Sequence, residues 1–239
     1  MKLDVLVVAA HPDDAEICVG GTLLLAKAAG KRIGIVDMTR GEMGTRGTAE
    51  DRAREVAAAN ALLQLDVREN LELPDGRVQD TLAARESLAA LFRRYTPDVV
   101  LAQHAIDHHP DHACTGRIAR EAWYLAGLAR LAQLTGGGQP HRSKRFYHYM
   151  GHVPFDPTFV VDIGAVWEQK RALVACFESQ LQPQSAQDDG RHFLYGSDIQ
   201  QRMETRARFY GERIAARWGE PLLASGPLPC FDPLLNLNS

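Results

Sequence analysis

The sequence predicts an α/β protein built on a doubly wound, Rossmann-like, mostly parallel sheet with helices on both faces. Short runs rich in Val, Ile and Leu, such as residues 4–9 and 98–102, are typical of strands buried on both faces. Such runs alternate with longer helical segments, and this alternation favours parallel strands joined by right-handed crossovers. The length of 239 residues fits one domain, which we assign to residues 1–239.

The elements follow from this alternation and from turn residues. Pro12 ends the first strand because proline cannot continue the pairing, and Gly30 ends the first helix. The glycine-rich loop 39–48 matches neither dinucleotide nor P-loop spacing, so we exclude a nucleotide site there. In chain order we expect strand 4–9, helix 20–29, strand 32–38, helix 49–64, strand 67–73, helix 81–94, strand 98–102, strands 145–150 and 159–163, and helices 165–177 and 199–216.

Composition excludes several classes of partner. The formal net charge of -3 argues against a nucleic-acid partner, since phosphate binding needs a basic face. The first apolar run is too short to cross a bilayer and lacks the basic leader of a secretory signal, so we expect no membrane association. The 4 cysteines are scattered without a Cys-x-x-Cys pair, which favours a reduced, cytoplasmic protein. The apolar segment after Gly219 is expected to pack on the body or on another subunit.

The first candidate site lies in residues 10–16 (AHPDDAE), directly after the first strand. His11, Asp13 and Asp14 crowd one turn at the carboxyl end of that strand, which is where open α/β sheets bind ligands. The alternative is a helix cap supplied by Asp13 or Asp14. A cap needs one Asp, however, and not a His with two Asp.

The second candidate site follows strand 98–102, where residues 104–112 hold four His and two Asp. Parallel strands end at the same edge of a sheet, so both clusters should meet; the alternative is a solvated polar loop. Two imidazoles and one carboxylate, from His11, His112 and Asp14, match a catalytic zinc centre or the facial triad of ferrous iron. Asp13 is then free to act as a base, and His109 can reach the far side of a bound substrate.

These motifs resemble a known family. Residues 10–16 with the glycines at 20–21, together with residues 109–112 (HPDH), are similar to the two signatures of the LmbE-like (PIG-L) metal-dependent N-acetylglucosamine deacetylases. Residues 41–48, 73–76 and 206–211 further resemble the branch that makes bacillithiol. That branch removes acetyl from N-acetylglucosaminyl malate in the bacterial cytoplasm.

The resemblance implies roles for particular residues. It implies that the metal ligands are His11, Asp14 and His112, that Asp13 is the general base, and that His109 stabilises the oxyanion. It also implies substrate contacts, listed here together: Arg52 and Asp75 on sugar hydroxyls, Glu42 and Arg46 in the pocket wall, and Tyr195 closing over the acetyl group. His108 stands where the branch commonly has Arg. The family also implies a homo-oligomer, of which a hexamer is one form.

The residues support one chemistry without the family. No Gly-x-Ser-x-Gly elbow is present, so a water activated by Zn²⁺ or Fe²⁺ is the expected nucleophile, with Asp13 taking its proton and a protonated His109 donating to the oxyanion. Asp111 is expected to orient a ligand imidazole, or else to cap a helix.

Some interpretations stay open. Arg52 has an alternative as an ion pair with Glu55, and Asp75 as ordinary turn chemistry before Gly76. Competing functions are a deacetylase or amidase for another N-acetyl sugar or thiol conjugate and, in another class, a sugar-binding module with a structural metal.

Overall fold

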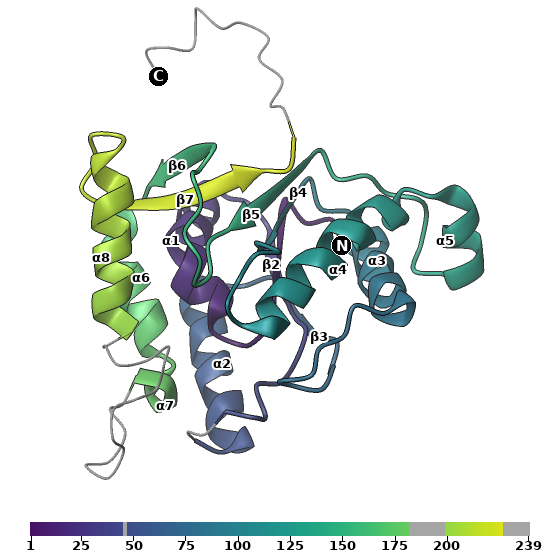
Figure 1. Cartoon of the computed structure of the whole chain (residues 1–239), viewed down its shortest axis with the longest axis horizontal. Helices are drawn as coiled ribbons and strands as arrows, with labels where there is room; N and C mark the ends of the chain where they lie inside the picture. Colours follow the sequence, from purple (N-terminus) through teal and green to yellow (C-terminus); the bar gives the residue numbers. More distant parts are fainter. Residues whose placement is uncertain (45–46, 182–198, 227–239) are drawn as a thin grey trace, which may run out of the picture.

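A single seven-stranded sheet forms the centre of the computed structural model, which describes residues 1–44, 47–181 and 199–226 (Figure 1). The strand order is β3-β2-β1-β4-β5-β7-β6. The strands are β1 (Val5–Ala9), β2 (Ile33–Asp37), β3 (Val67–Asn70), β4 (Val99–Gln103), β5 (Arg145–Tyr149), β6 (Phe159–Asp162) and β7 (Gly219–Ala224). The pairs from β3 to β5 are parallel, whereas β7 is antiparallel to both β5 and β6. The predicted mostly parallel α/β sheet is confirmed.

Helices cover both faces of this sheet, as Figure 1 shows. On one side lie α1 (Asp14–Ala28), α2 (Ala49–Leu63), α6 (Trp167–Ala175) and α8 (Ile199–Glu212), and on the other α3 (Leu82–Tyr95), α4 (Pro110–Ala126) and α5 (Ala129–Thr135). The 3₁₀ turn Gly164–Val166 precedes α6, and the short α7 (Glu178–Leu181) follows it. No helix in these described ranges is both long and apolar enough to cross a membrane.

The strand β1 supplies both hydrophobic cores because its side chains alternate between the faces. Val7 and Ala9 pack with buried residues of α1, α2, α6 and α8, while Leu6 and Val8 pack with those of α3 and α4. All four of these side chains are fully buried. The side chains of β1 are all apolar, so the polar residues that follow it lie in the loop at its end.

The helix α1 begins at Asp14, earlier than the predicted start at residue 20, and it passes through Gly20 and Gly21. Its backbone leaves helical geometry at Val19. A Cβ on Gly21 would lie 2.7 Å from Ile163 Cγ2 and 3.0 Å from Glu220 Oε1. The glycine therefore lets α1 approach the end of the sheet closely, and it does not mark the start of a helix.

The strand β7 was not predicted, because Pro221 argues against a strand inside a sheet. In the structure Pro221 pairs with Val160 of β6, and β7 pairs with β5 only from Leu222 onward. The proline thus lies where one side of β7 has no neighbour in register. The first part of the predicted apolar tail is therefore a sheet strand, and residues 227–239 lie outside the described residues.

Candidate metal centre

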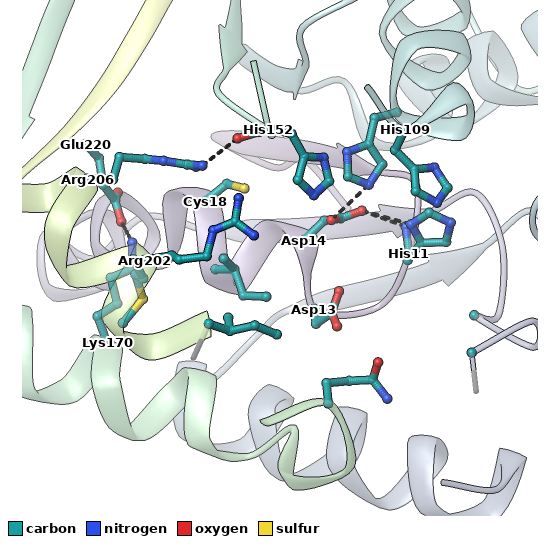
Figure 2. Close-up of a pocket in the computed structure, with 18 of the residues that line it drawn as sticks. His11, Asp13, Asp14, Cys18, His109, His152, Lys170, Arg202, Arg206 and Glu220 are labelled. Atoms are coloured by element: carbon teal, nitrogen blue, oxygen red, sulfur yellow. Dashed lines mark hydrogen bonds and ion pairs between the residues drawn. The ribbon is translucent and has the colours of Figure 1, made fainter. Parts of the chain in front are cut away.

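The two predicted clusters meet at the carboxyl edge of the sheet because β1 and β4 are neighbouring parallel strands. His11 follows β1, Asp14 opens α1, and His112 lies in the first turn of α4. Asp14 Oδ2 lies 3.3 Å from His11 Nδ1, and Asp14 Oδ1 lies 3.3 Å from His112 Nε2. The candidate ligand atoms of the three residues all lie within 4.8 Å of one another. All three line one pocket, and Figure 2 shows His11 and Asp14 at one end of it. The structure therefore brings the predicted ligands together.

The donor set fits a divalent ion. Two imidazole nitrogens and a carboxylate suit Zn²⁺ or Fe²⁺. Asp14 is held in place by the His11 amide and by Gln103 Nε2, which donate to Oδ2 at 2.9 and 3.0 Å. Burial raises the pKa of Asp14, but His112 and His11 outweigh it and hold that pKa well below its usual range. The ligand carboxylate is thus ionised at neutral pH.

Carboxylates also lie against the outer nitrogens of both imidazoles. His11 Nε2 lies 3.0 Å from Asp75 Oδ1 and 3.4 Å from Asp111 Oδ2. His112 Nδ1 lies 3.3 Å from Asp107 Oδ1, within ion-pair distance. Among the described residues this nitrogen has no hydrogen bond. Carboxylates in such positions fix the tautomer and the ring orientation of metal-binding histidines.

Asp111 is therefore placed to orient His11, as the sequence suggested. Its carboxylate also accepts the amides of Gly76 and Val78 at 2.7 and 3.1 Å. The carboxylate of Asp75 is similarly occupied, because it accepts the Met43 amide at 2.7 Å besides facing His11. A contact of Asp75 with a sugar hydroxyl stays a prediction.

Asp13 lies in the turn between β1 and α1 with a φ of 116°, in the left-handed region that non-glycine residues rarely adopt. Its side chain makes no cap hydrogen bond to α1, so the capping alternative fails for this residue. Strained backbone of this kind persists where the surroundings enforce it, often at functional sites. Burial and the neighbouring Asp14 raise the pKa of Asp13 to about 7, which suits a general base at neutral pH.

Arg52 of α2 reaches into the same turn. Its Nη1 donates to Pro12 O at 2.9 Å and lies 3.3 Å from Asp13 Oδ2. The alternative pairing with Glu55 is also present, although looser, with Arg52 Nε 3.9 Å from Glu55 Oε2. Arg52 lines the pocket, so contact with a substrate hydroxyl stays a prediction.

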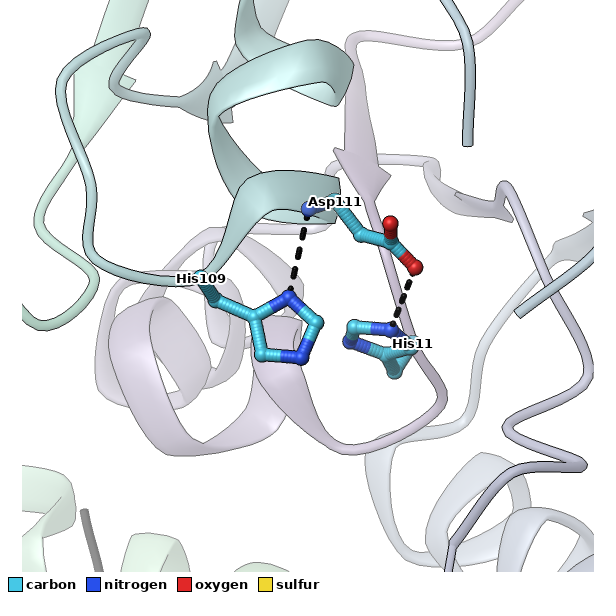
Figure 3. A group of neighbouring side chains, drawn as sticks. All are labelled: His11, His109 and Asp111. Carbon is cyan, nitrogen blue, oxygen red and sulfur yellow. Dashed lines mark hydrogen bonds and ion pairs between the residues drawn. The ribbon is translucent and has the colours of Figure 1, made fainter. Parts of the chain in front are cut away.

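His109 is the N-cap of α4, and its Nδ1 accepts the Asp111 amide at 3.2 Å (Figure 3). Its ring meets His11 edge-on, with the centroids 4.9 Å apart. Burial and the nearby His112 lower the pKa of His109, which favours the neutral ring at pH 7. With Nδ1 acting as an acceptor, the proton lies on Nε2. His109 is thus a neutral donor, and the expectation of a protonated imidazolium is not favoured.

The pocket has a volume of about 310 Å³ and extends from the metal centre toward α8 and β7. Glu42 is not among its lining residues; its carboxylate accepts the amides of Asp75 and Arg40 instead. Arg46 and Tyr195 lie outside the described residues. The lining residues that sequence reasoning missed include Cys18, His152, Lys170, Arg202, Arg206 and Glu220.

A buried ion pair closes the end of the pocket away from the metal centre. Lys170 of α6 bonds Glu220 of β7, and each side chain is only 2% exposed. The carboxylate of Glu220 also accepts the Gly21 amide at 2.9 Å and the Thr22 amide at 2.7 Å. Burial raises the pKa of the neighbouring Cys18 thiol to about 12, so this cysteine is not a nucleophile.

The fold and the site together define an α/β protein with a candidate metal centre of two histidines and one carboxylate at the edge of its sheet. A family model described as PIG-L, GlcNAc-PI de-N-acetylase, matches residues 6–123, a range that holds both clusters. The chain belongs to this family. Its relatives include deacetylases.

Three relatives show how far the likeness extends. The conserved protein TT1542 of Thermus thermophilus is 39% identical, with a TM-score of 0.84 over 97% of this chain and 98% of that chain. The diacetylchitobiose deacetylase of Thermococcus kodakarensis is 28% identical over 90% of this chain and 80% of its own length. The 4-oxalmesaconate hydratase of Pseudomonas putida is 26% identical over 73% of each. Deacetylation and hydration thus both occur among the relatives.

Proposed function

We propose that this protein is a metal-dependent N-deacetylase that hydrolyses the N-acetyl group of an N-acetylglucosaminyl conjugate. The observation that carries the proposal is geometric: the candidate ligand atoms of His11, Asp14 and His112 lie within 4.8 Å of one another at the pocket, and the carboxyl of Asp13 lines the same pocket. Burial and the neighbouring Asp14 raise the pKa of Asp13, which suits it to take up a proton near neutral pH. The family and its deacetylase relatives support the reaction class.

The residues divide the work among them. A divalent ion held by His11, Asp14 and His112 would supply Lewis acidity to the acetyl carbonyl and to a water. Asp13, oriented by Arg52, takes the proton from the attacking water and would return it to the amine nitrogen as the C–N bond breaks. His109 donates a hydrogen bond from its Nε2–H to the carbonyl oxygen as negative charge develops there, an interaction worth about 10²–10³ in rate. We propose Zn²⁺ as the ion, with Fe²⁺ as the alternative that the same ligands accept.

We propose N-acetylglucosaminyl malate as the substrate, in a cytoplasmic homo-oligomer. The support is the resemblance of residues 41–48, 73–76 and 206–211 to the bacillithiol branch. Arg52 and Asp75, which line the pocket, are the proposed contacts to sugar hydroxyls. Light scattering tests the oligomeric state, for which a monomer would contradict the proposal.

The proposed function is tested by metal analysis combined with an acetate-release assay. The zinc-loaded protein should release acetate from N-acetylglucosaminyl malate faster than from N-acetylglucosamine. Faster release from another N-acetyl sugar would move the substrate but keep the reaction. Because one relative is a hydratase, hydration is a second reaction to be assayed on the same metal-loaded protein. Bound metal without acetate from any amino sugar, and with water addition to an unsaturated dicarboxylate, would replace deacetylation by hydration.

A further inference from the structure

His152 lies in the loop that follows β5, beside the predicted ligands but outside the clusters that the sequence marked. Its side chain is 16% exposed and lines the pocket, and Figure 2 shows the ring directed toward the metal centre. Three imidazoles stand in a row here. His109 stacks on His112 with the ring centroids 4.7 Å apart, and His152 stacks on His112 with the centroids 4.9 Å apart and an interplanar angle of 13°.

The carboxylate of Asp107 decides which nitrogen of His152 meets the pocket. Asp107 Oδ1 lies 2.8 Å from His152 Nδ1, and Oδ2 accepts the His152 amide at 2.7 Å. Asp107 Oδ1 also accepts the His109 amide at 2.9 Å, so this carboxylate serves as an acceptor throughout. His152 Nδ1 therefore carries the donated proton, and in the neutral ring this tautomer makes Nε2, at the opposite edge, the acceptor.

The backbone around His152 is held from both sides. A Cβ on Gly151 would lie 2.2 Å from Asp107 Oδ2, so only glycine brings the chain this close. Arg206 of α8 donates to Met150 O at 3.0 Å and to Gly151 O at 2.6 Å. Such support fixes a side chain well enough for it to select a ligand.

We propose that His152 is a substrate-binding residue of this site, whose Nε2 accepts a hydrogen bond from the 3-hydroxyl of the amino sugar, next to the scissile acetamido group. The inference rests on the proposed function. His109 is assigned to the carbonyl oxygen. His152 also stacks on His112 and lines the same pocket, so it is available to the sugar that carries the amine. An oriented acceptor selects hydroxyl-bearing sugars, because a ligand without the hydroxyl leaves the half-buried imidazole without its partner.

The test measures binding without turnover. The zinc-loaded Asp13→Asn protein is titrated calorimetrically with N-acetylglucosamine and with its 3-deoxy analogue. Adding His152→Leu should weaken N-acetylglucosamine binding about tenfold, the size of one hydrogen bond, and leave the analogue unchanged. His152→Gln, which keeps an acceptor, should recover most of the affinity. His141→Leu is the matched control, because His141 bonds Pro97 O outside the pocket.

The outcomes separate the two claims. Equal affinities with and without His152, or an equal loss for both ligands, would overturn this inference alone. Loss of zinc in the His152→Leu protein would also overturn it, since His152 would then act on the metal through Asp107. No binding of either sugar to the Asp13→Asn protein, with no acetate release by the native one, would refute the proposed function as well.

Discussion

Gly151→Ala offers a sharp test of how the metal centre is supported. The new Cβ would lie 2.2 Å from Asp107 Oδ2 and 3.3 Å from His112 Nδ1, so Asp107, whose side chain is 1% exposed, must move. That movement disturbs its bonds from the His109 amide, the His152 amide and His152 Nδ1. Each bond to a charged group contributes about 1.5–3 kcal/mol, so we expect a loss of about 3 kcal/mol or more in unfolding free energy.

The same displacement removes the carboxylate that faces His112. Loss of such a partner typically weakens metal binding about 10–100-fold. Chelator competition measures the zinc affinity, and urea unfolding of the metal-free protein measures the stability separately. Gly226→Ala is the control, because a Cβ there has no neighbour within 4 Å. If Gly151→Ala bound zinc as tightly as the native protein, Asp107 would not be the support of His112.

Four further outcomes are expected. Asp13→Asn should keep its zinc but lose about 10²–10⁴ in kcat; loss of zinc would make Asp13 a ligand. Lys170→Met should cost about 3–5 kcal/mol by stranding buried Glu220, and adding Glu220→Gln should recover part of it; an additive double variant would count against the pair. Burial alone would raise the pKa of Asp66, but hydrogen bonds from Lys27 and the Ile33 amide outweigh burial, so the pKa lies below its ordinary 3.8. Its stabilisation is thus present above pH 3.8 and is lost as the pH falls through the folded-state pKa, so Asp66→Asn should cost about 1 kcal/mol at pH 6 and less at pH 3, by urea unfolding. Chelation of the metal should abolish acetate release and lower the Tm, and zinc should restore both; an unchanged Tm would mean no folded-state site.

The sequence predicted the metal centre because each half of it follows a strand with a clear pattern. His11 and Asp14 follow β1, and His112 follows β4, so parallel pairing alone brings them together. His152 follows β5, which is also parallel to β4, so its edge of the sheet was predictable too. His152 is a single polar residue after Met150 and Gly151, however, and is not part of a His/Asp cluster in the sequence, so no motif indicated its role.

Other features were not predicted, either because their local sequence signal is unusual or because they depend on contacts between distant residues. The helix α4 has His109 as its N-cap and Pro110 in its first turn, a start without the usual Ser, Thr or Asp signal. The neutral state of His109 depends on its burial and on His112. The contacts of the Asp75 carboxylate with His11 Nε2 and with the Met43 amide likewise form only when the loops are folded.

The bond network around Glu220 has a consequence for synthesis on the ribosome. Glu220 belongs to β7, yet its partners are Gly21 and Thr22 of α1 and Lys170 of α6. Proteins are synthesised from the amino end, so the candidate metal ligands leave the ribosome before β7 does. The pocket is therefore completed only after β7 has been added to the sheet. Termination ahead of residue 219 would remove a strand that pairs with both β5 and β6, and it would leave Lys170 and the amides of Gly21 and Thr22 without the Glu220 carboxylate.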